Sequence, residues 1–354
     1  MSIPTESIGS IPRPPQLLDA LREFRAGRLS QNRLDECCDA ALRDTIQRFE
    51  ATGSPVISDG EQAKPSFATY PLHGLGNIAQ DGIVINFADG HTRQLPRLTA
   101  GPFRYGVRAG SYVQAARRYA KRPVKQAVIS ASALSLVYPA QGIAGYARET
   151  FLDDLVAEAV ADIRSCLDQG AHHVQIDFTE GRLSVKLDPS KQLLQHFIDL
   201  NNRVLEHFSP QERLHLGVHT CPGGDHDSTH SAEVDYAELL PSLFQLKAGN
   251  FYMQLASEKD PDRVLSIVKA HLQPGQRIYV GVIDVLNPAV ETPEMVRDRV
   301  LRAAQYIPWD QLGSTDDCGF SPFEDDASTG RDTAFAKIRA RVVGTELAAR
   351  VLNC

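Results

Sequence analysis

Short apolar runs alternate with longer segments that carry apolar residues at helical spacing along the whole chain. A short apolar run bounded by turn residues is typical of a buried strand, and apolar positions roughly every three to four residues are typical of an amphipathic helix. The pattern predicts strands at residues 6–11, 55–59, 125–130, 172–177, 213–219, 250–254, 277–284 and 312–316. Helices are predicted at residues 34–52, 111–120, 148–169, 190–208, 234–246, 261–270, 293–306 and 333–352.

Strands that alternate with helices are typically parallel, and eight such pairs fit a closed α/β barrel of the (β/α)8 type, the TIM barrel, better than an open sheet. No linker rich in Pro, Gly or Ser divides the chain, so we expect residues 1–354 to form a single barrel domain. Residues 72–101 break the alternation and predict a β-hairpin that turns at residues 88–90. This insertion after the second strand, about residues 72–105, is expected to be either a partial lid over the barrel or a surface decoration.

Composition narrows the class of protein. With 42% hydrophobic and 23% charged residues, the chain has the material for a large core. The net charge is −7 and no long run of Lys or Arg is present, which argues against nucleic acid as a partner. No apolar stretch is long enough to span a membrane and the first residues lack a signal peptide, so a cytoplasmic protein is expected. A homo-oligomer is compatible with these features.

Six cysteines are too few for a disulfide framework in a chain of 354 residues. Cys37, Cys38 and Cys166 lie in helical patterns, where a cysteine is usually a small buried apolar residue, and Cys354 is in the tail. The two remaining cysteines, Cys221 and Cys318, therefore call for a different explanation.

Polar residues follow several of the predicted strands, where parallel barrels place their active sites. His219 and Cys221 lie two residues apart at the end of an extended segment, so both side chains can point the same way. Cys318 follows the last strand. Two thiolates and one imidazole form a ligand set that zinc favours, and three protein ligands leave a position open for substrate.

These three residues come from distant strands and not from clustered Cys pairs, which indicates a catalytic rather than a structural zinc. Such an ion would bind a thiol substrate and keep it deprotonated near neutral pH. The expected activity is therefore transfer of a methyl or alkyl group to sulfur, with Zn²⁺ as the cofactor.

Six stretches, in order, resemble the C-terminal barrel of cobalamin-independent methionine synthase: IGSIPRP, GEQ, VQIDF, HTC, GVIDVLNPAVETPE and DDCGF. Each is short, but their joint order across nearly the whole chain is specific. The resemblance implies a (β/α)8 barrel, a zinc ion held by one His, two Cys and one Glu, and methylation of homocysteine from a polyglutamyl folate.

By this resemblance His219, Cys221 and Cys318 are metal ligands. The fourth ligand of the family, a Glu, falls at Gln254, whose neutral amide is a poorer ligand than a carboxylate. Glu258 is an alternative, and so is water or substrate at that position.

The resemblance also implies that the amino acid part of homocysteine contacts Ile8, Gly9, Ser10, Glu61 and Asp177. This is chemically sensible, because two carboxylates can hold an ammonium group while backbone amides and a hydroxyl receive a carboxylate. For Asp177 and Ser10 the alternative is a purely structural role such as capping.

The part of the site that would hold the methyl donor departs from the family. The Trp on which the family stacks the pterin ring corresponds to Leu136 in this chain. The only tryptophan of the sequence, Trp309, precedes the last predicted strand. The family's proton-donating His is matched by Leu286, which leaves Asp284 as the nearest titratable residue. Because methyl transfer from a tertiary amine needs a protonated leaving nitrogen, a donor other than methyl-folate is expected. A corrinoid, free or on a corrinoid protein, and a strained ring such as an epoxide are candidates; the same barrel serves zinc thiol alkyltransferases that act on epoxides.

The loop after Cys221 carries two more candidate groups, His226 and His230, which are expected to be proton donors, alternative ligands or solvated side chains. Asp284 and His226 are the candidate catalytic residues. Two other functions stay open. One is a metal-free decarboxylase or lyase resembling uroporphyrinogen decarboxylase, with a cavity lined by arginines such as Arg13, Arg104, Arg108 and Arg182. The other is a non-catalytic protein that binds zinc or a thiol.

Overall fold

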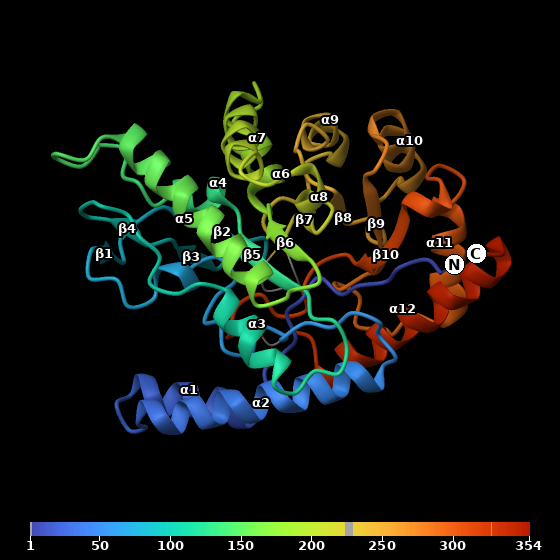
Figure 1. Cartoon of the computed structure of the whole chain (residues 1–354), viewed down its shortest axis with the longest axis horizontal. Helices are drawn as coiled ribbons and strands as arrows, with labels where there is room; N and C mark the ends of the chain where they lie inside the picture. The colour runs from blue at the N-terminus through green and yellow to red at the C-terminus, as the bar shows by residue number, and fades with distance from the viewer. Residues whose placement is uncertain (1, 224–228, 327) are drawn as a thin grey trace.

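The computed structural model describes residues 2–223, 229–326 and 328–354, and its centre is a six-stranded parallel sheet (Figure 1). The strand order is β10-β9-β8-β7-β6-β5, so each strand pairs with its neighbours in the sequence. Nearly every strand residue is buried, as expected for a parallel sheet covered by helices. The strands are β5 (Gln126–Ile129), β6 (Val174–Asp177), β7 (Leu216–Thr220), β8 (Asn250–Met253), β9 (Arg277–Ile283) and β10 (Leu312–Asp316).

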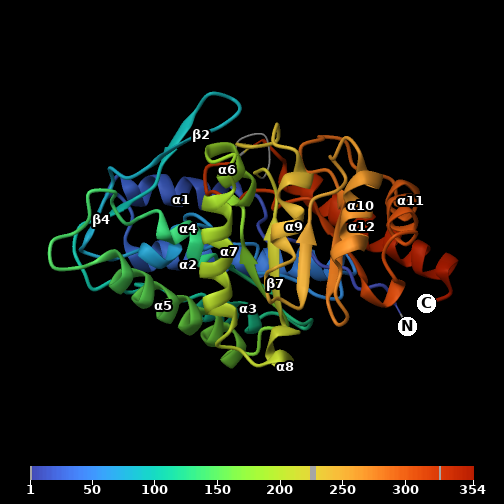
Figure 2. The ribbon, with the colours of Figure 1, turned by 90° about the horizontal axis from the view of Figure 1, so that it is seen from above.

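Helices connect these strands and cover the sheet (Figures 1 and 2). The longer ones are α1 (Pro15–Arg25), α2 (Gln31–Ala51), α3 (Gly110–Arg117), α5 (Arg148–Asp168), α6 (Glu180–Leu187), α7 (Gln192–Leu205), α10 (Pro261–His271), α11 (Pro293–Ala303) and α12 (Arg331–Leu352). The shorter ones are η1 (Tyr70–Leu72), α4 (Ala131–Ser135), α8 (Pro210–Arg213), η2 (Tyr236–Glu238), α9 (Leu240–Leu243) and η3 (Trp309–Gln311).

The six later predicted strands are confirmed, but the first two, at residues 6–11 and 55–59, are not regular strands. A parallel bridge from Thr5 to Ser314 on β10 lies directly before the first segment, and Ile57 in the second segment bridges Val124 just before β5. The two segments then approach each other, and the Ile11 N–H donates to the Gly60 carbonyl at 3.0 Å. The prolines at both ends of the first segment have no N–H to donate to a neighbouring strand, which limits the length over which this segment can pair.

The helix prediction at residues 234–246 was wrong. Two short helices, η2 and α9, occupy this region, because Pro241 lacks an N–H and is tolerated only in the first turn of a helix. The prediction also missed α1, which begins at Pro15 and packs against α2 in a separate small core with Leu17, Leu34 and Ala41.

Two antiparallel pairs lie between α2 and β5. They join β1 (Ile78–Ala79) with β4 (Arg97–Leu98), and β2 (Val84–Asn86) with β3 (Thr92–Gln94). The ribbon that carries β2 projects from the body of the molecule in Figure 2. The Phe87 N–H donates to the His91 carbonyl at 3.0 Å, so the chain turns at residues 88–90.

A buried polar network ties the first segment to the sheet. Glu6 accepts hydrogen bonds from Tyr252 at 2.7 Å and Tyr279 at 3.1 Å, and lies 2.8 Å from the Nδ1 atom of His173. Lys125 lies 3.7 Å from Glu6 and over the Tyr252 ring. Although burial opposes it, His173 and Lys125 lower the pKa of Glu6 to about 2. Glu6, His172 and His173 are close enough to resemble a metal site, but Glu6 is already satisfied within the protein.

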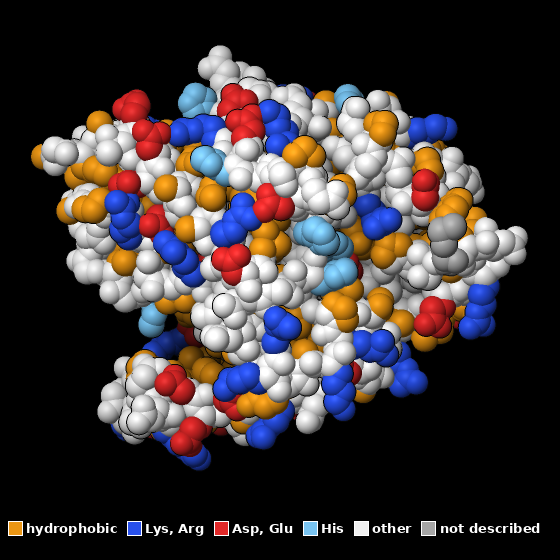
Figure 3. All heavy atoms as spheres, viewed as in Figure 1, with side chains coloured by type: hydrophobic (Ala, Val, Ile, Leu, Met, Phe, Trp, Pro, Cys, Tyr) orange, Lys and Arg blue, Asp and Glu red, His pale blue; other side chains and the backbone are white. Residues whose placement is uncertain are grey.

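Acidic and basic side chains are interspersed over the face in Figure 3. Within the described residues, no helix combines the length and the apolar character needed to cross a membrane.

Candidate metal centre and cavity

Three potential metal ligands from distant parts of the chain meet in the interior. His219 is on β7, Cys221 directly follows that strand, and Cys318 follows β10. Their ligand atoms all lie within 4.8 Å of one another, and the two sulfur atoms are 2.8 Å apart. Both cysteines are free thiols and nearly fully buried. One nitrogen and two sulfur atoms in this arrangement fit the donor set of zinc.

The imidazole of His219 is oriented for binding a metal. Its Nδ1 atom lies 3.1 Å from the carbonyl oxygen of Tyr252 on β8, so Nδ1 carries the hydrogen. The Nε2 atom is buried and has no hydrogen-bond partner among the described residues. A buried nitrogen without a partner is costly, and a metal ion at the two thiols would satisfy it.

The electrostatic environment also favours a deprotonated sulfur. Although burial opposes it, the Cys318 thiol and the His219 imidazole lower the pKa of Cys221 well below its ordinary value. The contact with Cys221, together with burial, raises the pKa of Cys318. The two thiols of Cys221 and Cys318 therefore lose their first proton easily and their second with difficulty. A cation bound between them would ease loss of the second proton.

Neither candidate for the fourth ligand joins this cluster. Arg182, a buried residue of α6, forms an ion pair with Glu258 at 2.7 Å and lies 3.4 Å from the amide oxygen of Gln254. The Gln254 amide nitrogen donates to Ser257 at 2.6 Å. Both side chains thus have partners other than the His219, Cys221 and Cys318 cluster.

The three ligands line a cavity of about 540 Å³. Ile8, Ser10, Glu61 and Asp177 line the same cavity, whereas Gly9 is not among its lining residues. Ser10 accepts a hydrogen bond from the Ser321 N–H at 3.1 Å, which leaves its own hydroxyl hydrogen free to donate. Four of the five predicted contacts with the amino acid therefore border one space with the metal ligands.

Glu61 is held in an unusual conformation for a residue with a side chain. Its φ is 57°, in the left-handed region, which costs of order 1 kcal/mol or more and is typical of functional sites. Arg13 donates to the Glu61 carbonyl at 2.9 Å, and Asp59 accepts from its N–H at 3.1 Å. These contacts point the carboxylate into the cavity wall, 3.1 Å from the buried Lys64 ammonium.

Lys64 was not anticipated from the sequence. Burial opposes its charge, but Glu61 and Asp59 raise its pKa, so it is a cation. Burial also raises the pKa of Asp177 to about 6, and Gln175 donates to its Oδ1 atom at 2.7 Å. The carboxyl groups of Glu61 and Asp177 thus share the buried Lys64 cation in this part of the cavity.

The rest of the cavity is mainly apolar. Leu136, which the resemblance places at the position of the family's pterin-stacking Trp, is one of its lining residues, whereas Trp309 is not among them and has 40% of its surface exposed. Further lining residues are Ile85, Phe87, Leu95, Ile129, Leu134 and Val137. The segment from β2 to β3 therefore forms part of the wall.

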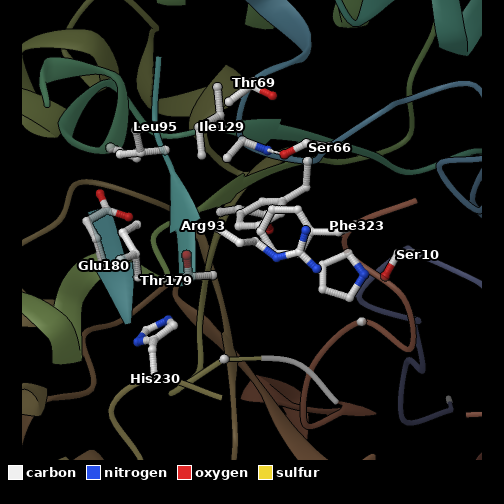
Figure 4. A pocket seen from close by; sticks show the side chains of 18 of the residues that line it. Ser10, Ser66, Thr69, Arg93, Leu95, Ile129, Thr179, Glu180, His230 and Phe323 are labelled. Carbon is white, nitrogen blue, oxygen red and sulfur yellow. Dashed lines mark hydrogen bonds between the residues drawn. The ribbon is translucent and has the colours of Figure 1, made fainter. Parts of the chain in front are cut away.

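An acidic loop at residues 322–325 lines another side of the cavity. Arg93 stacks on Phe323, with 3.9 Å between guanidinium carbon and ring centroid, as seen at the centre of Figure 4. Arg93 also pairs with Asp325 and Asp326, each at 3.0 Å. An ion pair between Arg25 and Glu324 joins α1 to the same loop.

The predicted catalytic residues are not brought together. Asp284 follows β9 and is not a lining residue of the cavity; its Oδ1 atom accepts from the Leu286 N–H at 2.9 Å, within its own turn. His226 lies outside the described residues. His230 does line the cavity, and burial lowers its pKa to about 4, so its imidazole is neutral.

The arginines expected in a uroporphyrinogen decarboxylase-like cavity are engaged elsewhere. Arg13 donates to four backbone carbonyls and a serine, Arg104 and Arg108 pair with acids on α5, and Arg182 pairs with Glu258. Among the described residues, only Arg25 and Arg93 line the cavity, and both are paired with acids. The cavity is therefore poorly suited to a substrate with several carboxylates.

The chain is similar to known methionine synthases along most of its length. A methionine synthase of Sulfolobus acidocaldarius is 24% identical over 327 residues, which are 90% of this chain and 85% of that protein. A 5-methyltetrahydropteroyltriglutamate–homocysteine methyltransferase of Aeromonas salmonicida is 23% identical over 90% of this chain, but this chain spans only 40% of that longer enzyme.

Solved structures share the fold. A B12-independent methionine synthase from a Shewanella species, in complex with selenomethionine, has a TM-score of 0.78 at 19% identity, covering 100% of this chain and 99% of its own. A putative vitamin-B12 independent methionine synthase from Listeria monocytogenes has a TM-score of 0.72 at 19% identity, with 98% of each chain covered. Residues 3–339 match the family described as the catalytic domain of cobalamin-independent synthase, and the chain belongs to this family.

Proposed function

We propose that the protein is a zinc-dependent transferase that moves a methyl or other alkyl group to the sulfur of a small thiol such as homocysteine. The observation that carries the proposal is the convergence of the His219 Nε2 atom and the Cys221 and Cys318 thiols on a cavity that Glu61 and Asp177 also line. The names of the relatives point to the same class of reaction. When bound, zinc supplies a positive charge that keeps a thiol sulfur deprotonated near neutral pH.

The residues of this chain would bind and orient the amino acid part of the thiol. The Glu61 and Asp177 carboxylates would receive an ammonium group, with Lys64 holding Glu61 in place at 3.1 Å. The free hydroxyl hydrogen of Ser10 would donate to a carboxylate. Fixing the thiol between these groups and the metal ligands removes the entropy cost of bringing the reactants together.

The donor would occupy the apolar part of the cavity, between the sheet and the segment from β2 to β3. In this proposal the six strands and the two bridged segments act as one (β/α)8 barrel domain, and residues 72–105 are an insertion that serves as a partial lid. The apolar wall, with Leu136 and without a Trp, favours a donor other than methyl-folate. The solved relatives are B12-independent by name, so a corrinoid donor has no support and is not proposed.

Metal analysis and X-ray absorption test the proposal. Protein purified without chelators should carry about one zinc per chain, with two sulfur neighbours that become three when homocysteine is added. The matched control thiol is 4-mercaptobutyrate, which lacks only the amino group. Asp177→Asn should weaken binding of homocysteine and leave that of 4-mercaptobutyrate almost unchanged. Zinc far below one per chain, or a sulfur count that does not rise, would overturn the proposal.

A further inference from the structure

Glu180 is a buried acid of the cavity wall that the sequence did not single out. It begins α6, three residues after Asp177, is 6% exposed and lines the cavity together with Thr179 and Leu95 (Figure 4). Its Oε1 atom contacts two hydroxyl groups, Ser130 at 2.6 Å and Ser132. Its Oε2 atom is buried and has no hydrogen-bond partner among the described residues.

The hydrogen-bond directions around Oε1 are fixed by the surrounding backbone and amide groups. The Ser130 hydroxyl accepts from the Ala133 N–H at 3.0 Å, and the Ser132 hydroxyl accepts from the Asn201 amide at 2.7 Å. Each hydroxyl therefore has its own hydrogen left to donate to Glu180. Since Oε1 accepts two hydrogen bonds, a proton on this carboxyl group belongs on Oε2, the atom without a partner.

The charge of Glu180 is sensitive to pH in the neutral range. Burial raises the pKa of Glu180 to about 7, and the nearby Asp177 carboxylate adds to this rise. The hydrogen bonds from the two serine hydroxyls act in the opposite direction and lower the pKa. The other titratable lining residue near α6, His230, has a pKa lowered to about 4 and holds no proton to give at pH 7. Among the described residues that line the cavity, Glu180 is thus an acid without a cationic partner that loses its proton near neutral pH.

We propose that Glu180 is a catalytic residue that donates the Oε2 proton to the leaving atom of the alkyl donor. The inference rests on the proposed transferase function. It also names the donor class, which is compounds whose alkyl carbon is bonded to an oxygen or nitrogen atom that acts as the leaving atom. The sulfur–carbon bond forms as the bond from carbon to the leaving atom breaks, and that bond's electron pair goes to the leaving atom. The leaving atom takes the proton, Glu180 becomes a carboxylate, and solvent restores its proton after product release.

Two alkylating probes separate proton donation from a structural role. Methyl iodide expels iodide, which needs no proton, whereas 1,2-epoxypropane expels an alkoxide, which does. Homocysteine is the thiol for both, so its ionisation cancels in the ratio of the two rates. In Glu180→Gln the amide oxygen can still accept from both serines, so the wall is preserved while the acid is removed.

We expect the ratio of the epoxypropane rate to the methyl iodide rate to fall about 100-fold in Glu180→Gln, the low end of general acid catalysis. In the wild type the same ratio should fall as pH rises above about 7, because the protonated form is lost. The pH profile needs no variant and serves if Glu180→Gln fails to fold. Asp284→Asn is the comparison variant for the other acid suggested by the sequence.

A ratio that is independent of both Glu180 and pH would overturn the inference, and so would a ratio that falls only in Asp284→Asn. Wild-type protein that accelerates methyl iodide alone would also overturn it, while leaving thiol activation intact. If neither probe reacts faster than without protein, the proposed function itself has failed.

Discussion

The contact between Gly319 and Ser10 offers a quantitative test of how the last loop is joined to the first segment. A Cβ built on Gly319 would overlap the Ser10 hydroxyl oxygen, whereas it would lie 3.3 Å from the Ser10 Cβ. An alanine at position 319 must therefore turn the Ser10 hydroxyl away from the Ser321 N–H, from which the hydroxyl now accepts a hydrogen bond at 3.1 Å. Leaving a buried N–H unpaired costs about 1–3 kcal/mol, and the backbone gain of Gly→Ala offsets about 0.4–1 kcal/mol.

Gly319→Ala should therefore lower the free energy of unfolding by about 1–2 kcal/mol. In a Ser10→Ala background the overlapping oxygen and its hydrogen bond are already gone, so the same change should cost roughly nothing. Urea unfolding of the wild type, the two single variants and the double variant gives the coupling energy, expected at about 1–2 kcal/mol. If Gly319→Ala costs as much with Ser10→Ala as without it, the overlap with the hydroxyl is not what excludes a side chain here.

Three further predictions concern the metal ligands and the buried charges. Cys318→Ser should reduce zinc affinity at least about 100-fold, measured by metal analysis after dialysis against a weak chelator. The control is Cys37→Ser, at a half-buried cysteine, which should keep the wild-type zinc content. The pKa of Glu6 in the folded protein, about 2, lies below the ordinary 4.5, so the contribution of Glu6 to stability is complete above about pH 4.5 and is lost as the pH falls toward 2. The difference in free energy of unfolding between wild type and Glu6→Gln should therefore shrink by about 3 kcal/mol over that range. A difference that does not depend on pH would refute this. Arg341→Met leaves the buried Asp316 without its partner at 2.5 Å and should cost about 3–5 kcal/mol in urea unfolding, most of which Asp316→Leu in the same chain should restore.

Strands with long apolar runs were predictable because their pattern depends on burial alone. Residues 277–284 and 250–254 were placed to within a residue, since both faces of a parallel strand are covered. The segments around Ile8 and Ile57 are also buried, but one bridge lies at each of them. Whether such a segment pairs along its length depends on the neighbouring strand and on prolines at its ends, which a local pattern does not contain.

The residues of the candidate site also differ in how far the sequence could predict them. His219 and Cys221 could be paired from their spacing at the end of one strand, and Cys318 could be added from its place after another. Gln254 and Glu258 were suggested as ligands by position, yet the structure pairs both with Arg182, which is distant in the sequence. Lys64 and Glu180 were missed because nothing in the residues next to them distinguishes a buried ion or acid from one on the surface.

The sequence by itself determined which residues could bind a metal, the alternation of strands and helices, and the family to which the chain belongs. These depend on residue type and on spacing along one element. Only the tertiary structure decided which side chains border the cavity and what each is paired with. Partners such as Ser132 for Glu180 and Ser10 for Gly319 come from remote segments, and a side chain's protonation and freedom to react depend on those partners and on its burial.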